Sequence, residues 1–292
     1  MLTFLSGFIF PAIVSVILIG FLFGRFKPVR LKRIADFTVY ISGPCLVFSL
    51  LAKQELYNIK TANLTLAAFF VILSIGLLLL LFSKISHSKL PPEIYFASMF
   101  MNTAFFGYPI ILFAFGTNGL KYAVIFDVVN ALLMFTVGVY IFTLGSKKCK
   151  FLKLPFVYAT ALGLIVSFSH FYISNLVLSP LQVIGSLTVP LALFILGHRL
   201  SKIKIKNWKI IVFSLFSRFG LGLVLSLLAV YIFRLETAVA NVVIMMSVMP
   251  AGINTIVFSE EFDGNTELAA SILAATTLAA LVILPIVLLC LN

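Results

Sequence analysis

Polar residues and residues that break helices occur in the middle of two long apolar segments, one in each half of this 292-residue sequence. They are Asn102, Thr103, Gly107 and Pro109 in the first segment, and Pro250, Gly252 and Asn254 in the second. Proline removes a backbone donor and glycine tolerates unwound backbone, so Gly-x-Pro or Pro-x-Gly in such a segment predicts a broken helix. In lipid, a break of this kind is tolerated where it lines a cavity. Half-helix N-termini then offer free N–H groups and a positive dipole end to an anion, so the pattern predicts an anion site.

The two asparagines, Asn102 and Asn254, add neutral donors and acceptors at the same depth. The alternative is that the prolines only kink these helices and that the asparagines hold neighbouring helices together. Because the pattern occurs at matching places in both halves, we favour the binding site.

The elements that carry these residues are membrane-spanning helices. Hydrophobic residues make up 62% of the chain and charged residues 10%, which excludes a soluble domain. A span needs roughly 20 apolar residues, and runs of this length fit helices rather than barrel strands. We therefore expect an all-α, single-domain membrane protein of residues 1–292. Its spans are expected near 3–24, 34–52, 62–83, 91–116, 118–144, 155–174, 177–199, 209–233, 237–262 and 265–291.

Lysine and arginine predict the orientation of these spans. Sixteen fall in the loops after spans 1, 3, 5 and 7, and only Lys53, Lys60, Lys121 and Arg234 fall in the alternate loops. By the positive-inside rule, this bias places both termini outside, in the cytoplasmic (inner) membrane of a bacterium.

The basic odd loops of both halves also predict an inverted repeat, with repeat one at 1–146 and repeat two at 147–292. Sequence similarity supports it. The second span of each half carries Pro-x-x-aliphatic-Phe, from Pro44 to Phe48 and from Pro190 to Phe194.

Two ionisable residues, Asp127 and Arg218, are predicted deep inside spans 5 and 8. Charges at this depth are costly and must face the protein interior or water. Asp127 could carry a coupling proton or ion, and Arg218 could attract a substrate carboxylate. Alternatively, the two form a buried ion pair that only fixes helix packing.

Several other function classes find no support in the sequence. The basic residues lie between apolar segments, so nucleic acid is not an expected partner. The three cysteines have no metal-ligand spacing, so we expect no metal and no cofactor. Motifs for nucleotide binding, zinc proteases and serine hydrolases are missing, so we do not expect an enzyme.

The strings Asn102-Thr103-x-x-x-Gly107-x-Pro109 and Pro250-x-Gly252-Ile253, the latter followed by Val257-Phe258-x-x-Glu261-Phe262, resemble the auxin efflux carrier family. This family includes plant auxin exporters and bacterial permeases proposed for malonate and malate, and the resemblance covers the whole chain. It implies a scaffold of helices 1, 2, 6 and 7 and a moving bundle of helices 3–5 and 8–10, in which broken helices 4 and 9 cross at mid-membrane.

The resemblance further implies a small organic anion, such as malonate, malate or an auxin-like acid, held beside the crossing by Asn102. It implies elevator-type alternating access and a homodimer. An inside-negative potential opposes uptake of an anion, so uptake requires a coupled cation, a proton or sodium. A membrane-embedded sensor or an anion channel of the same fold is the alternative.

Overall fold

The computed structural model describes residues 15–26, 31–52, 59–143, 155–169, 171, 173–201 and 208–291. Within these ranges the regular structure is helical, and the only β-type pairing is an isolated bridge. The all-α prediction is therefore confirmed for the described part of the chain. The predicted start of the first span at residue 3 lies outside it.

The chain divides into two compact units, Met1–Leu56 with Thr143–Ile203, and Tyr57–Phe142 with Lys204–Asn292. Each unit thus combines a stretch from the first half of the sequence with one from the second half.

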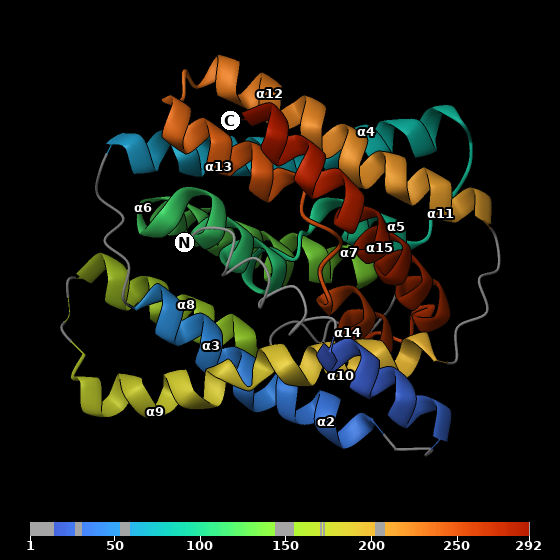
Figure 1. The fold of residues 1–292 in the computed structure, drawn as a ribbon, viewed down its shortest axis with the longest axis horizontal. Coiled ribbons are helices and arrows are strands. Elements are labelled where there is room, and N and C mark those ends of the chain that lie inside the picture. The colour runs from blue at the N-terminus through green and yellow to red at the C-terminus, as the bar shows by residue number, and fades with distance from the viewer. Residues whose placement is uncertain are drawn as a thin grey trace. The chain divides into compact units, whose positions relative to one another are not determined.

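The first unit contains a helix at Ser15–Phe26 and further helices that come, in sequence, before residue 57 and after residue 142. Their bounds are α2 Lys32–Phe37, η1 Thr38–Ser42, α3 Gly43–Leu51, α8 Pro155–Ser169, α9 Asn175–Ser186 and α10 Thr188–Leu200. Helix α3 packs against α8 and α9 (Figure 1). The Ser15–Phe26 helix approaches α10 closely, since a Cβ on Gly197 would lie 1.9 Å from the Ile17 carbonyl oxygen. Small residues allow such backbone contact between membrane helices.

The second unit contains the two segments predicted to be broken. Its elements are α4 Ile59–Ile85, α5 Pro92–Met99, η2 Thr103–Gly107, α6 Tyr108–Leu133, η3 Met134–Gly138, α7 Val139–Thr143, α11 Trp208–Leu215, η5 Phe216–Gly220, α12 Leu221–Ile232, α13 Thr237–Ser247, α14 Asn254–Glu261 and α15 Thr266–Leu291. Helix α12 packs against α4 and α13, and α6 also packs against α4 and α13 (Figure 1).

The chain reverses within α6 at Gly116, whose φ of 67° favours glycine. Hydrogen bonds from Met101 and Tyr108 to residues 127–130 show that the segments before and after this glycine run antiparallel. Spans 4 and 5 were predicted to meet between residues 116 and 118, and the turn lies there.

Aromatic rings fill the interior of the second unit next to α14. The ring of Phe258 on α14 lies 5.0 Å from that of Phe96 on α5 and 5.7 Å from that of Phe135 in η3. Buried Glu93, at the start of α5, accepts hydrogen bonds from the Ser259 hydroxyl and the Asn265 N–H. These contacts hold α14 and the start of α15 against α5.

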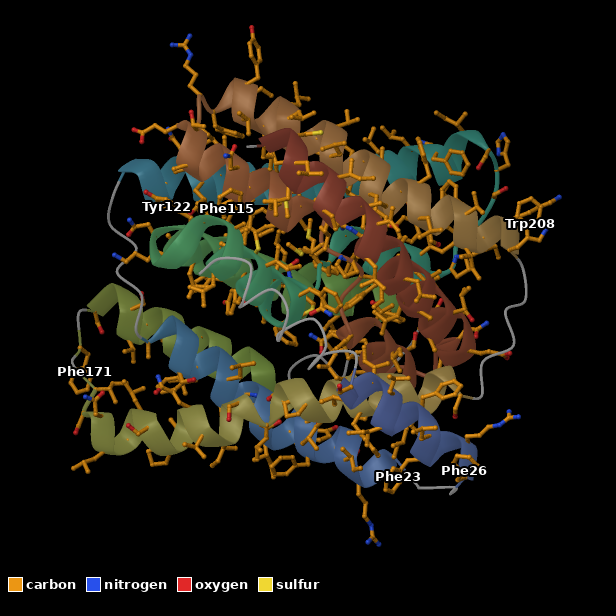
Figure 2. All side chains as sticks on the ribbon, viewed as in Figure 1. Phe23, Phe26, Phe115, Tyr122, Phe171 and Trp208 are labelled. Carbon is orange, nitrogen blue, oxygen red and sulfur yellow. The ribbon has the colours of Figure 1, made fainter. Side chains whose placement is uncertain are left out.

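The surface of the long helices is apolar. In the described part of the chain, four helices are long and apolar enough to cross a membrane: Ala62–Ile85, Asn118–Phe142, Trp208–Ile232 and Thr266–Leu291. Their exposed side chains include Leu77, Tyr231 and Leu289, and Figure 2 shows Trp208, 66% exposed, directed away from the helices of its unit. A surface with this much exposed apolar area fits contact with lipid rather than water. The count of ten spans stays a prediction.

One predicted span is wrong in detail. Residues 177–199 were expected to form one helix, but the described chain has two, α9 and α10, separated at Leu187. Pro190 lies in the first turn of α10, where its missing N–H costs no intrahelical hydrogen bond.

Candidate functional site

The helical backbone is interrupted in both polar segments. Helix α5 ends at Met99, Phe100 is extended at φ −105° and ψ 118°, and η2 begins at Thr103. Helix α13 ends at Ser247, and α14 begins at Asn254. We call residues 100–102 the first interruption and residues 248–253 the second interruption.

The two interruptions lie side by side and pair through their backbones. Met101 and Ala251 form an isolated antiparallel bridge. The Asn102 N–H donates to the Pro250 carbonyl at 2.8 Å, and the Gly252 N–H donates to the Phe100 carbonyl at 2.9 Å. Unwound backbone away from water must satisfy its polar groups within the protein, and these segments do so by bonding each other.

A side chain from a helix later in the chain, α6 in one case and α15 in the other, supports each bridge residue. Asn130 on α6 accepts a hydrogen bond from the Met101 N–H at 3.3 Å and donates to the Met101 carbonyl at 3.1 Å. Thr276 on α15 accepts from the Ala251 N–H at 3.3 Å. Asn130 and Thr276 thus bond the backbone of the interruptions themselves.

Proline plays different parts in the two segments. Pro250 lies inside the second interruption, as predicted. Gly107-x-Pro109 was predicted to break the first segment, and this is wrong: the backbone there is helical, and the interruption lies upstream at residues 100–102. The π-helical turn η2, in which the Tyr108 N–H bonds the Thr103 carbonyl, immediately precedes Pro109, the second residue of α6.

Gly107 serves close packing. A Cβ at this position would lie 2.7 Å from the sulfur of Met246 on α13. As the last residue of η2, Gly107 therefore allows the close contact between η2 and α13 rather than unwound backbone.

Each interruption is followed by a helix whose N-terminus adjoins the bridge. The first N–H groups of a helix have no intrahelical partner and carry the positive end of its dipole. Asn102 directly precedes η2 and is 4% exposed, and its side-chain amide has no hydrogen-bond partner among the residues that the structure describes. Asn254 is the first residue of α14, and its Nδ2 lies 3.3 Å from the sulfur of Met134.

Asp127 is joined to the helix that follows the first interruption. Its two carboxylate oxygens accept hydrogen bonds from the Thr103 hydroxyl and, at 2.6 Å, from the Tyr108 hydroxyl. Thr103 in turn accepts from Asn130 Nδ2 at 3.1 Å. Asp127 is 9% exposed, so these four side chains form a buried polar network beside the bridge.

Arg218 contacts the helices that precede the interruptions. Its side chain is 0% exposed, and its guanidinium donates to the carbonyls of Ser98 and Ser247. Ser98 lies in the last turn of α5, and Ser247 is the last residue of α13. Carbonyls at a helix C-terminus lack intrahelical donors and carry the negative end of the dipole. Two helix ends therefore balance one buried positive charge.

The ion pair between Asp127 and Arg218, one of the alternatives for these residues, is not formed. In the described part of the chain each binds other groups, hydroxyls for Asp127 and helix-end carbonyls for Arg218. The physical reason is that helix ends already provide the countercharge for Arg218. The contribution of Ser98, Ser247 and Tyr108 was missed, since nothing in the sequence distinguishes a carbonyl or a tyrosine that bonds across helices.

The arrangement is that of a membrane transport protein. The model of the membrane transport protein family matches residues 8–152 and 143–288, so the chain belongs to this family, and the resemblance to auxin efflux carriers is confirmed.

A relative of similar length supports the same class. An uncharacterized transporter of Methanocaldococcus jannaschii is 29% identical over 293 residues, covering 93% of this chain and 94% of that protein. The chain is thus a multi-pass membrane transporter and not an enzyme.

Proposed function

We propose that the protein is a secondary transporter that moves a small organic anion across the cytoplasmic membrane. The observation that carries the proposal is the pairing of the two interruptions, which brings two half-helix N-termini to one place next to Asn102, whose amide has no partner among the described residues. Such N-termini stabilise negative charge without adding a fixed positive charge.

The substrate is a carboxylate such as malonate, malate or an auxin-like acid. Asn102, Thr103 and Asn254 contact it through side-chain or backbone N–H groups, while Gly107, Pro109, Pro250 and Gly252 shape the backbone around it. A carboxylate accepts hydrogen bonds only, which suits donors of this kind.

The ten spans form an inverted 5+5 repeat in which helices 4 and 9 cross at mid-membrane, with both termini outside. The proposal is supported by the position of each interruption in the fourth predicted span of its half. It is also supported by the backbone hydrogen bond that each interruption donates to a side chain of the fifth predicted span, Asn130 in one half and Thr276 in the other.

Transport follows an elevator-type displacement of the bundle of helices 3–5 and 8–10 against a scaffold of helices 1, 2, 6 and 7, which forms a homodimer. The division of the chain into two units with these components supports the assignment. A proton or sodium ion is coupled where the anion is taken up against an inside-negative potential.

Counterflow in proteoliposomes tests the function. Liposomes loaded with unlabelled malonate, malate or indole-3-acetate should take up the labelled compound transiently and saturably. A channel or a sensor would not show saturable exchange.

The Asn102→Ala variant tests the site. Loss of a hydrogen bond to a charged group costs about 1.5–3 kcal/mol, so apparent affinity should fall about tenfold to a hundredfold. The exposed Asn118, next to the Gly116 turn, provides a matched control as Asn118→Ala. Unchanged saturable counterflow by Asn102→Ala would contradict the placement of the site.

A further inference from the structure

Asp127 is the carboxylate of the buried polar network that adjoins the proposed anion site. It is bonded to Thr103, the residue that follows Asn102, and to Tyr108 in the first turn of α6. A negative charge at this place repels an anion bound at the same half-helix N-terminus. The anion site therefore gains affinity if this charge is neutralised when substrate binds.

The groups around Asp127 provide no fixed countercharge. Among the helical segments that pack against α6, α13, η2 and η3 contain no titratable residue. Helix α4 carries Lys60 and Lys84, both in its end turns, and α6 itself carries Tyr108, Lys121 and Tyr122 besides Asp127. Within the described chain, the polar atoms that meet the carboxylate are the two hydroxyls alone.

These hydroxyls favour a proton over a metal ion as the neutralising species. Sodium binds to oxygen lone pairs, and several oxygens must converge on it. Here Thr103 and Tyr108 direct their hydrogens at the carboxylate, and Asn130 directs an N–H at Thr103. The described residues searched for metal sites also show no group of three or more His, Cys, Asp or Glu side chains.

We propose that Asp127 is the proton-binding site of a proton-coupled anion transporter, and that it is protonated when the anion is bound. This inference rests on the proposed function. A proton from water adds to Oδ2 of Asp127, which then donates to the Tyr108 oxygen. The Tyr108 hydroxyl hydrogen rotates out of its present hydrogen bond and becomes available to another acceptor, while Thr103 continues to donate to Oδ1.

Reversal of the Asp127–Tyr108 hydrogen bond links binding of the proton to binding of the anion. Protonation removes the negative charge and frees the Tyr108 donor, so proton binding favours anion binding, and by linkage anion binding favours protonation to the same degree. One proton and one substrate monoanion, such as indole-3-acetate or singly protonated malonate, then cross together without net charge, so a pH gradient, and not the membrane potential, drives uptake.

The test measures accumulation of a labelled carboxylate in proteoliposomes under a pH gradient. With the outside one pH unit more acidic, a one-to-one symporter accumulates the anion about tenfold over the level without a gradient. The Asp127→Asn variant keeps a neutral side chain that can accept from the Thr103 hydroxyl and donate to the Tyr108 oxygen, as the protonated carboxyl would. It should still exchange substrate, at an altered rate, but its accumulation should no longer respond to the pH gradient. Asp263→Asn, at an exposed loop position with φ 56°, is the matched control and should behave like the wild type.

Each result decides between the hypotheses. Absence of counterflow by the wild type contradicts the proposed function itself. Counterflow by the wild type without accumulation in a pH gradient contradicts the proton site and leaves the proposed function standing. Accumulation that follows a sodium gradient instead has the same consequence.

A second measurement does not depend on the variant's transport rate. When the carboxylate is added to purified wild-type protein in weakly buffered detergent, the protein should take up about one proton per bound anion. Tyr108→Phe, which keeps Asp127 but removes the hydroxyl, should still take up the proton and bind the anion more weakly. Proton uptake by Asp127→Asn equal to that of the wild type would refute the assignment.

Discussion

The two interruptions have similar backbones and different surroundings. The first covers residues 100–102, and the polar network of Asn130, Thr103, Asp127 and Tyr108 adjoins it. The second covers residues 248–253, and its supporting groups are Thr276, the Thr255 hydroxyl that donates to the Gly252 carbonyl at 2.7 Å, and Asn254 against a methionine sulfur. The comparison shows that two paired interruptions can share their backbone pairing while the buried carboxylate adjoins only the first of them.

Arg218 serves both interruptions equally, so its loss should have the largest effect. Arg218→Leu leaves the carbonyls of Ser98 and Ser247 without their donor, and we expect a loss of about 3–5 kcal/mol of stability. The melting temperature of the detergent-purified protein should fall sharply, or folded protein should not be recovered.

Arg218→Lys separates charge from geometry. An ammonium keeps the charge but cannot span two carbonyls as the planar guanidinium does, so intermediate stability is expected. Arg234→Gln, in the turn between α12 and α13, serves as the control. If Arg218→Leu melts at the wild-type temperature, the two helix ends do not depend on this charge.

Loss of the side chain that supports the first interruption should lower the free energy of unfolding more than loss of the one that supports the second. Asn130→Leu leaves both the N–H and the carbonyl of Met101 without a partner, whereas Thr276→Val leaves only the Ala251 N–H. With about 1–3 kcal/mol for each unsatisfied buried group, Asn130→Leu should cost about 2–3 kcal/mol and Thr276→Val about 1 kcal/mol. Thermal unfolding of the two variants side by side measures the difference, and equal losses would show that the halves are supported equally.

Much of this arrangement follows from sequence because residue type limits backbone conformation in lipid. The length of the apolar runs predicts helices, and Pro250 and Gly252 mark the second interruption where it occurs. The first interruption could not be located from Gly107 and Pro109, since a π-helical turn precedes the proline and keeps the backbone helical.

The partners of the charged residues could not be predicted either. Arg218 binds backbone carbonyls, and every residue has a carbonyl, so the sequence gives no signal for its partners. The hydroxyls on Asp127 come from Thr103, which follows Asn102 in the quoted motif, and from Tyr108, which occupies the unspecified position between Gly107 and Pro109. Such contacts depend on how the helices pack.

The asparagines at the two half-helices should differ in their effect on substrate affinity. The Asn102 amide has no hydrogen-bond partner among the described residues, whereas Asn254 already contacts the Met134 sulfur. We expect Asn102→Ala to weaken apparent affinity about tenfold or more. Asn254→Ala should weaken it only about threefold, because the Asn254 amide must give up its weak contact with the Met134 sulfur to bind substrate. Concentration-dependent counterflow for both variants gives the ratio, and a larger loss at Asn254 would reverse the assignment of the two halves.

Alanine at the glycines of the two segments should have the smallest effects on stability, and the two effects should differ. In Gly107→Ala the new methyl would lie 2.7 Å from the Met246 sulfur, so this flexible side chain must move. In Gly252→Ala the nearest atom is the Phe100 carbonyl oxygen at 3.3 Å, a contact that a shift of a few tenths of an ångström relieves. We expect about 1 kcal/mol of destabilisation for the first and less for the second, measured by thermal unfolding. A Gly107→Ala, Met246→Ala double variant more stable than Met246→Ala alone would establish that Gly107 provides space for the methionine rather than backbone freedom.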